Sequence, residues 1–248
     1  MIDVKDIPTT CGADWKRDAI ATENAPVTQN LVDAGMVLLG KQSLLEFAMG
    51  GIDHNPHFGY TRNPWNLDYF SGGSSSGASA SVSAGLAAGA LGTDTGGSVR
   101  QPAAYCGIVG MKTTHGLVSL EGVFPMAPSL DTVGPLTRSV MDNALLLEAM
   151  AGRSNTFSAG LDQQTPKNLR VGLPVKWVEN DADSEVAKCC FAAAEAMREA
   201  SEEAEAQFSG VNLDSQAAAL IEFQQAYQAS SRILQTAREL FQTLIEVV

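Results

Sequence analysis

Basic residues are scarce in this 248-residue chain, which has 16 Lys and Arg against 28 Asp and Glu and a formal net charge of −12. Nucleic-acid-binding surfaces concentrate Lys and Arg against phosphates, so this balance argues against direct binding of nucleic acid. No apolar run approaches the ~20 residues that span a bilayer, and the N-terminus lacks the charged-then-apolar layout of a signal peptide. We therefore expect a cytoplasmic protein without a membrane segment.

Cysteine and histidine are also few and show no metal or disulfide pattern. The four cysteines are Cys11, Cys106, Cys189 and Cys190. Their spacing matches neither a disulfide framework nor paired zinc ligands, which agrees with a reducing compartment. His54 and His57 have no further ligand types arranged around them, so we interpret both as loop residues. No metal and no cofactor are expected.

The chain is long enough for one sizeable globular domain, and 45% of its residues are hydrophobic. Apolar spacing and capping residues predict helices over residues 25–34, 77–89, 139–151, 181–206 and 215–248. Short apolar runs predict strands over residues 36–39, 89–93 and 169–173, the first of them buried. Residues 59–71 are loop-like. The alternation of helices and strands indicates an α/β fold.

The most informative stretch, residues 71–102, holds two Gly-Gly-Ser turns around a run of tiny residues. The first turn ends at Ser74 and the second at Ser98. Paired glycines permit positive φ and let bare N–H groups approach a ligand, as the stabilisation of an oxyanion requires. The helix between the turns is so rich in alanine that it must pack closely against neighbouring backbone. These features predict catalysis by the backbone and serines of the two turns.

Three other chemistries fit this stretch less well. Residues 73–77 match the G-x-S-x-G of an α/β-hydrolase, but the only histidine downstream is His115 and Asp94 lies inside the second turn. Residues 94–96 match an aspartic-protease triplet, yet the sequence has no second triplet to complete the carboxylate pair. Neither glycine-rich segment is followed by the Lys-Ser/Thr of a phosphate-binding loop. Joint use of both serines explains both turns at once.

In that interpretation Ser98 is the nucleophile, and Ser74 relays its proton toward a base. The N–H groups behind the nucleophile are those of Thr95, Gly96 and Gly97. The motifs GGSSSG, GALGTDTGGSVRQPAAYCGIVGMKTTHG and SLDTVGPLTRSV resemble the amidase signature family, whose members hydrolyse carboxamides. The resemblance covers about residues 1–152. It implies an amidase signature α/β fold, with a mixed β-sheet sandwiched between helices, and a small-molecule amide substrate.

The family works through a Ser-cisSer-Lys triad. Carried over to this chain, the resemblance implies that Ser98 is the nucleophile and Ser74 the cis-peptide serine. It also implies an oxyanion hole formed by the backbone of Thr95, Gly96, Gly97 and Ser98. Asp94 and Arg100 are expected to order the turn as a carboxylate–guanidinium pair.

The lysine of the triad has no gap-free match inside the chain. Residues 1–13, MIDVKDIPTTCGA, resemble the segment that follows the family's catalytic Lys-Asp, so we expect that dipeptide just before Met1. Lys5 repeats the dipeptide but would need a deletion to join the triad, and we interpret it as a solvated loop lysine. We therefore expect a single amidase signature domain over residues 1–248, truncated at both ends. Its core would be residues 1–152, with a strand and peripheral helices over 153–248.

Other roles stay open at this point. The A subunits of glutamyl-tRNA amidotransferases share these motifs, hydrolyse glutamine and pass the ammonia to their partner proteins. A homodimer and an inactive fragment that has lost its lysine are the remaining alternatives. Without a lysine to accept the proton, we expect this polypeptide alone to hydrolyse amides far more slowly than a full-length parent.

Overall fold

The computed structural model describes residues 1–50, 55–161 and 172–200. The chain divides into two compact units, Met1–Asp162 and Gln163–Val248. His54, most of the strand predicted at 169–173 and the helix predicted at 215–248 lie outside the described residues. Both Gly-Gly-Ser turns belong to the first unit.

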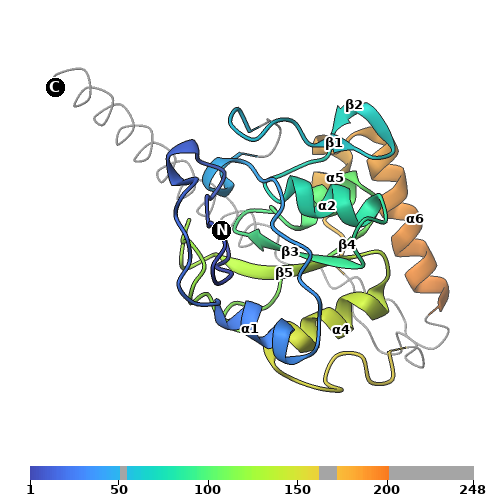
Figure 1. Cartoon of the computed structure of the whole chain (residues 1–248). Helices are drawn as coiled ribbons and strands as arrows, with labels where there is room; N and C mark the ends of the chain where they lie inside the picture. The colour runs from blue at the N-terminus through green and yellow to red at the C-terminus, as the bar shows by residue number, and fades with distance from the viewer. Residues whose placement is uncertain (51–54, 162–171, 201–248) are drawn as a thin grey trace. The chain divides into compact units, whose positions relative to one another are not determined.

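A three-stranded antiparallel sheet forms the centre of the first unit (Figure 1). Its strand order is β3 (Gly89–Asp94), β5 (Thr132–Thr137) and β4 (Val109–Gly110). β5 is buried along its whole length, as expected for a central strand that is covered on both faces. The register sets Asp94 opposite Thr132 at one end of the sheet. The strand predicted at 89–93 is therefore confirmed.

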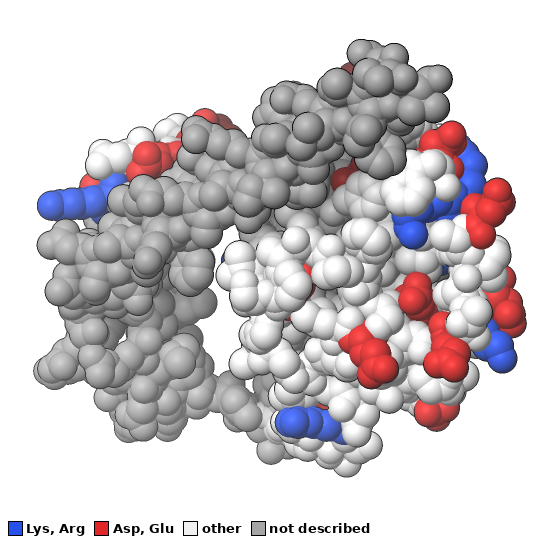
Figure 2. Space-filling model, turned by 90° about the vertical axis from the view of Figure 1, so that its left-hand side faces the viewer, with Lys and Arg blue, Asp and Glu red and all other residues white. Residues whose placement is uncertain are grey.

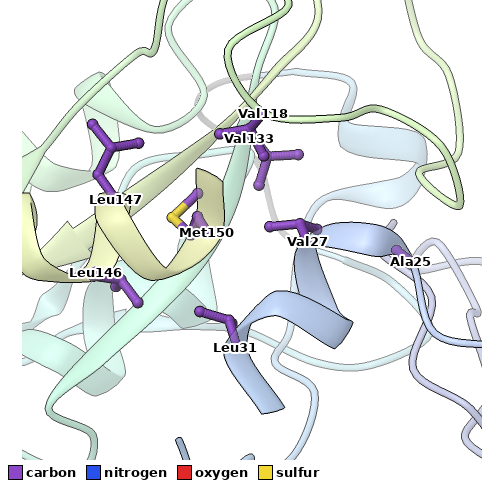
Figure 3. Close-up of a cluster of buried hydrophobic side chains, with 8 residues drawn as sticks. All are labelled: Ala25, Val27, Leu31, Val118, Val133, Leu146, Leu147 and Met150. Atoms are coloured by element: carbon purple, nitrogen blue, oxygen red, sulfur yellow. The ribbon is translucent and has the colours of Figure 1, made fainter. Parts of the chain in front are cut away.

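Helices cover both faces of this sheet. On one face α1 (Pro26–Asp33) packs against α4 (Val140–Ala151). The buried side chains there are Ala25, Val27, Leu31, Val118, Val133, Leu146, Leu147 and Met150 (Figure 3). On the other face lie α2 (Ser76–Ser83) and α3 (Arg100–Tyr105), whose alanines pack with Leu136 of β5. Val133 and Leu136 are three positions apart and so point to opposite faces of the strand. The resulting helix–sheet–helix layers confirm the predicted α/β fold class.

Helix α2 packs as closely as its small residues predict. A Cβ added to Gly77 would lie 2.6 Å from the carbonyl oxygen of Ser43. One added to Gly92 of β3 would lie 2.5 Å from Ser75 Oγ, so only glycine fits at either contact. The helix ends at Ser83, earlier than the predicted 77–89.

Capping residues set the other helix boundaries. Ser139 Oγ accepts a hydrogen bond from the N–H of Asp142 at 3.1 Å, and Gly152 follows α4 in the left-handed conformation with φ 63°. Pro26 begins α1, where its fixed φ suits the first helical position. The helices predicted at 25–34 and 139–151 are therefore confirmed to within one residue at each end.

Two local predictions are wrong. Residues 36–39 form no strand and are not buried, since Val37 is 81% exposed and Leu39 76%. A strand needs a neighbour that takes up its N–H and C=O groups, and this segment pairs with none among the described residues. Residues 59–71 are not only loop but contain a hairpin of β1 (Arg62–Asn63) and β2 (Asn66–Phe70).

In the second unit the structure describes α5 (Val175–Asp181) and α6 (Ser184–Ala200). The helix predicted at 181–206 thus begins at Ser184 and is described as far as Ala200. None of the helices within the described ranges is long and apolar enough to cross a membrane. On the face shown in Figure 2, the described surface carries acidic and basic side chains without a continuous basic patch.

A buried carboxylate fastens the end of α4 to the loop that follows it. Glu148 Oε1 accepts hydrogen bonds from the N–H groups of Phe157 and Ser158, each at 2.8 Å, and from Ser158 Oγ at 2.9 Å. These donors stabilise the ionised carboxylate and lower the pKa of Glu148 from 4.5 to about 2, with the Ser158 N–H contributing most.

Glu148→Gln should therefore destabilise the protein in a pH-dependent way. Because the pKa of Glu148 is lower in the folded state, its contribution to stability is present above about pH 4.5 and is lost as the pH falls toward 2. Urea unfolding at pH 7 should show a clear loss in the variant, and the difference from wild type should shrink between pH 4.5 and pH 2. The exposed Glu121→Gln serves as the control. A difference that is the same at all pH values would contradict this assignment.

Candidate active site

The fold brings the two Gly-Gly-Ser turns into direct contact. The first turn leads into α2 and the second follows β3. The N–H of Ser75 donates to the carbonyl oxygen of Ser98 at 3.1 Å. Ser74 and Ser98, the two serines predicted to be catalytic, therefore lie on adjoining segments, with Ser98 half-buried.

Ser74 has an unusual environment for a serine. Its side chain is 1% exposed, and its Oγ has no hydrogen-bond partner among the described residues. The peptide bond between Gly73 and Ser74 is cis. A buried hydroxyl without a partner loses the hydrogen bonds that water would provide, so such groups are rare and call for an explanation. The Ser74 hydroxyl is thus available to exchange a proton with a group brought to it.

The second turn presents backbone to open space. Gly97 has φ 126°, a conformation that other residues rarely adopt. A Cβ added to Gly96 or to Gly97 would meet no atom within 4 Å. The N–H of Gly96 makes no hydrogen bond within the described residues, whereas the N–H of Gly97 donates to Asp94 Oδ1 at 2.8 Å. The outer side of the turn is therefore free for a ligand, while the Gly97 donor is already used to shape it.

A buried carboxylate holds this turn from behind. Asp94 is fully buried, and Arg100 donates to both of its oxygens, from Nε and from Nη2, each at 3.0 Å. The N–H of Val99 adds a bond of 3.2 Å to Oδ2. Burial by itself raises the pKa of Asp94, but Arg100 and the backbone N–H groups of Gly97 and Val99 outweigh burial and hold the pKa below its usual value. Asp94 and Arg100 are thus brought together as expected from the sequence.

A second carboxylate, which sequence reasoning missed, fixes the same turn from the neighbouring strand. Asp131, just before β5, accepts a hydrogen bond from the hydroxyl of Thr95. Its Oδ2 also accepts from the N–H groups of Met126 at 2.8 Å and Ala127 at 2.9 Å. Beside it, Thr132 Oγ1 donates to the carbonyl oxygen of Asp94 at 3.1 Å. Asp131 lies inside the motif SLDTVGPLTRSV, so the motif contained the signal, but only the sheet register shows which group the aspartate binds.

Among the described residues, no lysine is hydrogen-bonded to Ser74 Oγ. Lys5 is exposed, and its backbone N–H donates to Asn24 Oδ1 at 2.8 Å, in line with its interpretation as a loop lysine. Lys41 donates from Nζ to Thr9 Oγ1 at 2.7 Å. Neither lysine is hydrogen-bonded to the Ser74 hydroxyl. His57 lies in the turn after residue 54, as the loop interpretation expects.

Comparisons with known proteins identify the family. The family model described as Amidase matches residues 1–246. The A subunit of glutamyl-tRNA(Gln) amidotransferase from Desulfotalea psychrophila is 42% identical over 198 residues, which cover 76% of this chain and 41% of that protein. Its counterpart from Shouchella clausii is 43% identical over 197 residues, which cover 75% of this chain and 41% of that protein.

Solved structures show the same relationship. The A subunit of glutamyl-tRNA(Gln) amidotransferase from Thermotoga maritima superposes with a TM-score of 0.75 at 31% identity, covering 93% of this chain and 58% of that one. The peptide amidase of Stenotrophomonas maltophilia superposes with a TM-score of 0.72 at 34% identity, covering 81% of this chain and 44% of that one. The chain therefore belongs to the amidase family and has the amidase signature fold, which confirms the resemblance of its motifs. It spans about two fifths of the length of the curated relatives it matches.

Asp131→Asn should weaken the turn, because the amide replaces an ionised acceptor that serves three donors at a buried position. Hydrogen bonds to charged groups typically contribute ~1.5–3 kcal/mol each, so we expect the free energy of unfolding to fall by about 1–3 kcal/mol. Urea unfolding measures this loss. Thr95→Val should cost less, and the double variant should lose less than the two single losses added together. Exposed Asp68→Asn is the control, and strictly additive losses would refute the coupling.

Proposed function

We propose that this chain carries the acyl-transfer centre of an amidase, which cleaves the carbon–nitrogen bond of a carboxamide with Ser98 as nucleophile. The observation that carries the proposal is the buried hydroxyl of Ser74, which has no hydrogen-bond partner among the described residues and lies on the segment that is hydrogen-bonded to Ser98. Membership of the amidase family supports it. In this proposal residues 1–248 are part of one amidase signature domain, with the signature core at 1–152 and a strand and peripheral helices at 153–248.

The geometry suggests a role for each group. Ser98 Oγ attacks the amide carbonyl, and its proton passes to Ser74 and on to a lysine, the third member of the triad that the family implies. The backbone of residues 95–98 stabilises the oxyanion, and one of its donors is the Gly96 N–H, which makes no hydrogen bond among the described residues. Asp94 and Arg100 hold the turn in shape without touching the substrate. Ammonia or an amine leaves with the relayed proton, and water then releases the acid from Ser98.

A second candidate function is supported by the comparisons. The relatives described above at 42% and 43% identity are A subunits of glutamyl-tRNA(Gln) amidotransferase, which favours glutamine as the amide and partner proteins as the recipients of ammonia. Solved structures of enzymes named for other amides favour the first candidate. One is the peptide amidase, and another is a 6-aminohexanoate cyclic dimer hydrolase. The hydrolase is 32% identical with a TM-score of 0.71, covering 79% of this chain and 44% of that one. Ammonia release from glutamine, measured beside release from a peptide amide, separates the two. We expect hydrolysis that is not restricted to glutamine.

The nucleophile can be tested without a known substrate. A fluorophosphonate probe should label Ser98, as located by mass spectrometry of the digested protein, and Ser98→Ala should abolish the labelling. Ser74→Ala should slow labelling, because it removes the hydroxyl that takes the proton from Ser98. Exposed Ser154→Ala should label at the wild-type rate. Labelling of another serine, or equal labelling of the Ser98→Ala variant, would end the proposal.

A further inference from the structure

A cluster of aromatic side chains and one lysine lies on the surface of the first unit. Its members, here called the Trp15 cluster, are Trp15, Lys16, Phe47 and Phe124. The ring centroids of Trp15 and Phe47 are 6.0 Å apart, and those of Phe47 and Phe124 are 5.3 Å apart. Lys16 Nζ lies 5.4 Å from the Trp15 ring centroid and 5.5 Å from that of Phe124. The three rings and the ammonium group therefore form one continuous surface.

The Phe47 ring of the cluster lies on a segment that contacts the first Gly-Gly-Ser turn, here called the first serine turn. Phe47 lies in η2 (Glu46–Ala48), a short 3-10 turn. Leu45 directly precedes this turn, and its N–H donates to the carbonyl oxygen of Ser74 at 3.1 Å. A Cβ added to Gly73 would also lie 2.8 Å from Leu45 Cδ1. The segment that carries Phe47 is thus packed against and hydrogen-bonded to the Ser74 turn.

The Phe124 ring lies on a segment that is connected through Asp131 to the second Gly-Gly-Ser turn, here called the second serine turn. Phe124 is two residues before Met126, whose N–H donates to Asp131 Oδ2 at 2.8 Å. The other oxygen of the Asp131 carboxylate accepts from the Thr95 hydroxyl. The side chain of Met126 packs in the same buried cluster as Phe47. The Phe47–Phe124 pair therefore forms where segments anchored to the two serine turns converge.

The backbone under the cluster is strained and firmly held. Phe47 has φ 52° and ψ 26°, and Ala48 has φ 60°, so two successive residues with side chains occupy the left-handed region. Such strain persists where the surroundings enforce it, and it is concentrated at functional sites. The N–H of Phe47 donates to the carbonyl oxygen of Cys11 at 2.7 Å, which fixes the turn. The backbone that carries the Phe47 ring is thus fixed by the fold itself.

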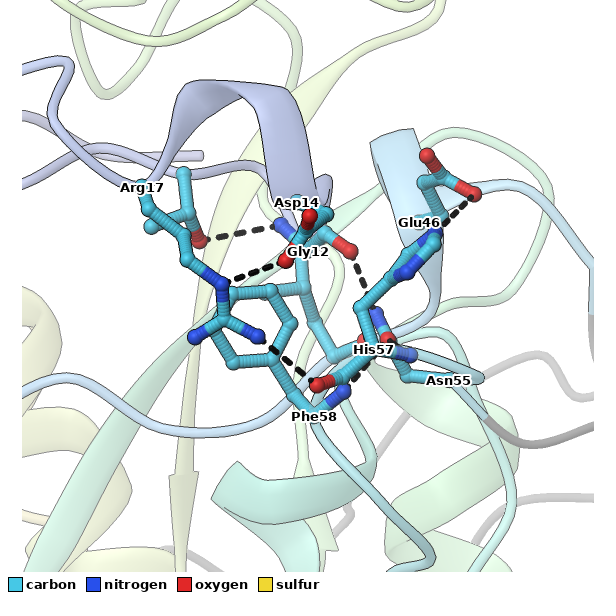
Figure 4. Close-up of polar contacts among 9 residues, drawn as sticks. Gly12, Asp14, Arg17, Glu46, Asn55, His57 and Phe58 are labelled. Atoms are coloured by element: carbon cyan, nitrogen blue, oxygen red, sulfur yellow. Dashed lines mark hydrogen bonds and ion pairs between the residues drawn. The ribbon is translucent and has the colours of Figure 1, made fainter.

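A polar network around Arg17 holds the backbone of the segment that carries the third ring, Trp15 (Figure 4). Trp15 lies in η1 (Asp14–Lys16), and Arg17, the residue after η1, pairs with Asp14. Arg17 Nη2 donates to the carbonyl oxygen of His57 at 3.0 Å, and its guanidinium lies 4.4 Å from the ring centroid of Phe58. These contacts tie η1 to the turn at 55–58 and so fix the backbone that carries Trp15.

Trp15 nevertheless leaves most of its surface to solvent. Its exposed fraction is 75%, and that of Phe124 is 38%. Trp65 is similarly exposed, but its Nε1 donates to the carbonyl oxygen of Cys106 at 2.8 Å, which gives it a structural role. Trp15 makes no such bond within the described residues, and Lys16 has no carboxylate partner there. Lys16 Nζ lies over part of this surface, and the remaining exposed area of the indole, beside the Phe47–Phe124 pair, is suited to stacking on a flat ring.

We propose that the Trp15 cluster binds an aromatic group carried by the carboxamide substrate. The inference rests on the proposed amidase function, because the cluster is attached to both serine turns. It names the substrate class as aryl carboxamides, whose ring stacks on Trp15 and Phe124 while the amide reaches the turn at residues 95–98. An aliphatic ring of the same size lacks the flat face that this surface favours.

Ligand-observed NMR on the full chain tests the inference without catalysis. Saturation transfer should detect benzamide bound at its ring protons, with cyclohexanecarboxamide binding about 3- to 10-fold more weakly. Trp15→Leu and Phe124→Leu should each weaken the binding of benzamide by a similar factor, whereas Trp15→Phe should keep the wild-type affinity. Trp177→Leu, which replaces an exposed tryptophan of the second unit, is the matched control. Unchanged benzamide affinity in Trp15→Leu overturns the proposal.

A second measurement separates failure of this inference from failure of the proposed function. Benzamide should slow the labelling of Ser98 by the fluorophosphonate probe in the wild type and should slow it several-fold less in Trp15→Leu. If the probe labels Ser98 but benzamide slows labelling equally in wild type and Trp15→Leu, the cluster is not part of the site and the amidase proposal stands. If Ser98 does not label but benzamide binding depends on Trp15, the amidase proposal fails and the aromatic site remains. Thermal unfolding of Trp15→Leu, expected to match wild type because the side chain is exposed, checks the fold.

Discussion

The arrangement of the site depends on the buried carboxylate of Asp94. A negative charge without partners at this fully buried position would be far too costly to retain. Its hydrogen-bond donors are the backbone N–H groups of Gly97, Val99 and Arg100 and the guanidinium of Arg100. All of these donors lie within six positions after Asp94 in the sequence. Satisfying the carboxylate therefore closes the chain into the turn that carries Ser98, so one charge dictates the path of the backbone.

The ion pair within this network contributes geometry more than net stability. The Arg100 side chain is about half exposed, whereas Asp94 is buried, so the guanidinium keeps part of its hydration and the carboxylate keeps none. The desolvation cost of a buried charge offsets much of the attraction in such pairs. What the pair does provide is a bidentate contact with fixed directions. A neutral pair of similar size would fill the space but would not orient the N–H groups of the turn.

Local patterns in the sequence predicted the parts of the structure that local interactions determine. The paired glycines marked both turns, and Ser139, Gly152 and Pro26 marked helix ends because capping acts within a few residues. The apolar run at 36–39 was misread because burial of a strand depends on a distant neighbour, and an apolar run carries no information about that neighbour. The role of Asp131 was missed for the same reason, since its contact with Thr95 spans 36 positions and exists only through the pairing of β3 with β5.

The second turn is fastened on one side and open on the other, which is the arrangement that the proposed oxyanion site needs. Asp94 and the side chains of Asp131 and Thr132 hold it from the sheet, with bonds to its backbone and to the Thr95 hydroxyl. On the opposite side a Cβ at Gly96 would meet nothing within 4 Å. Donors that are fixed before the substrate arrives need no reorganisation when charge develops on the carbonyl oxygen. In the proposed reaction, a turn held by loop contacts alone would have to be ordered when the substrate binds, whereas the pairing of β3 with β5 orders this turn during folding.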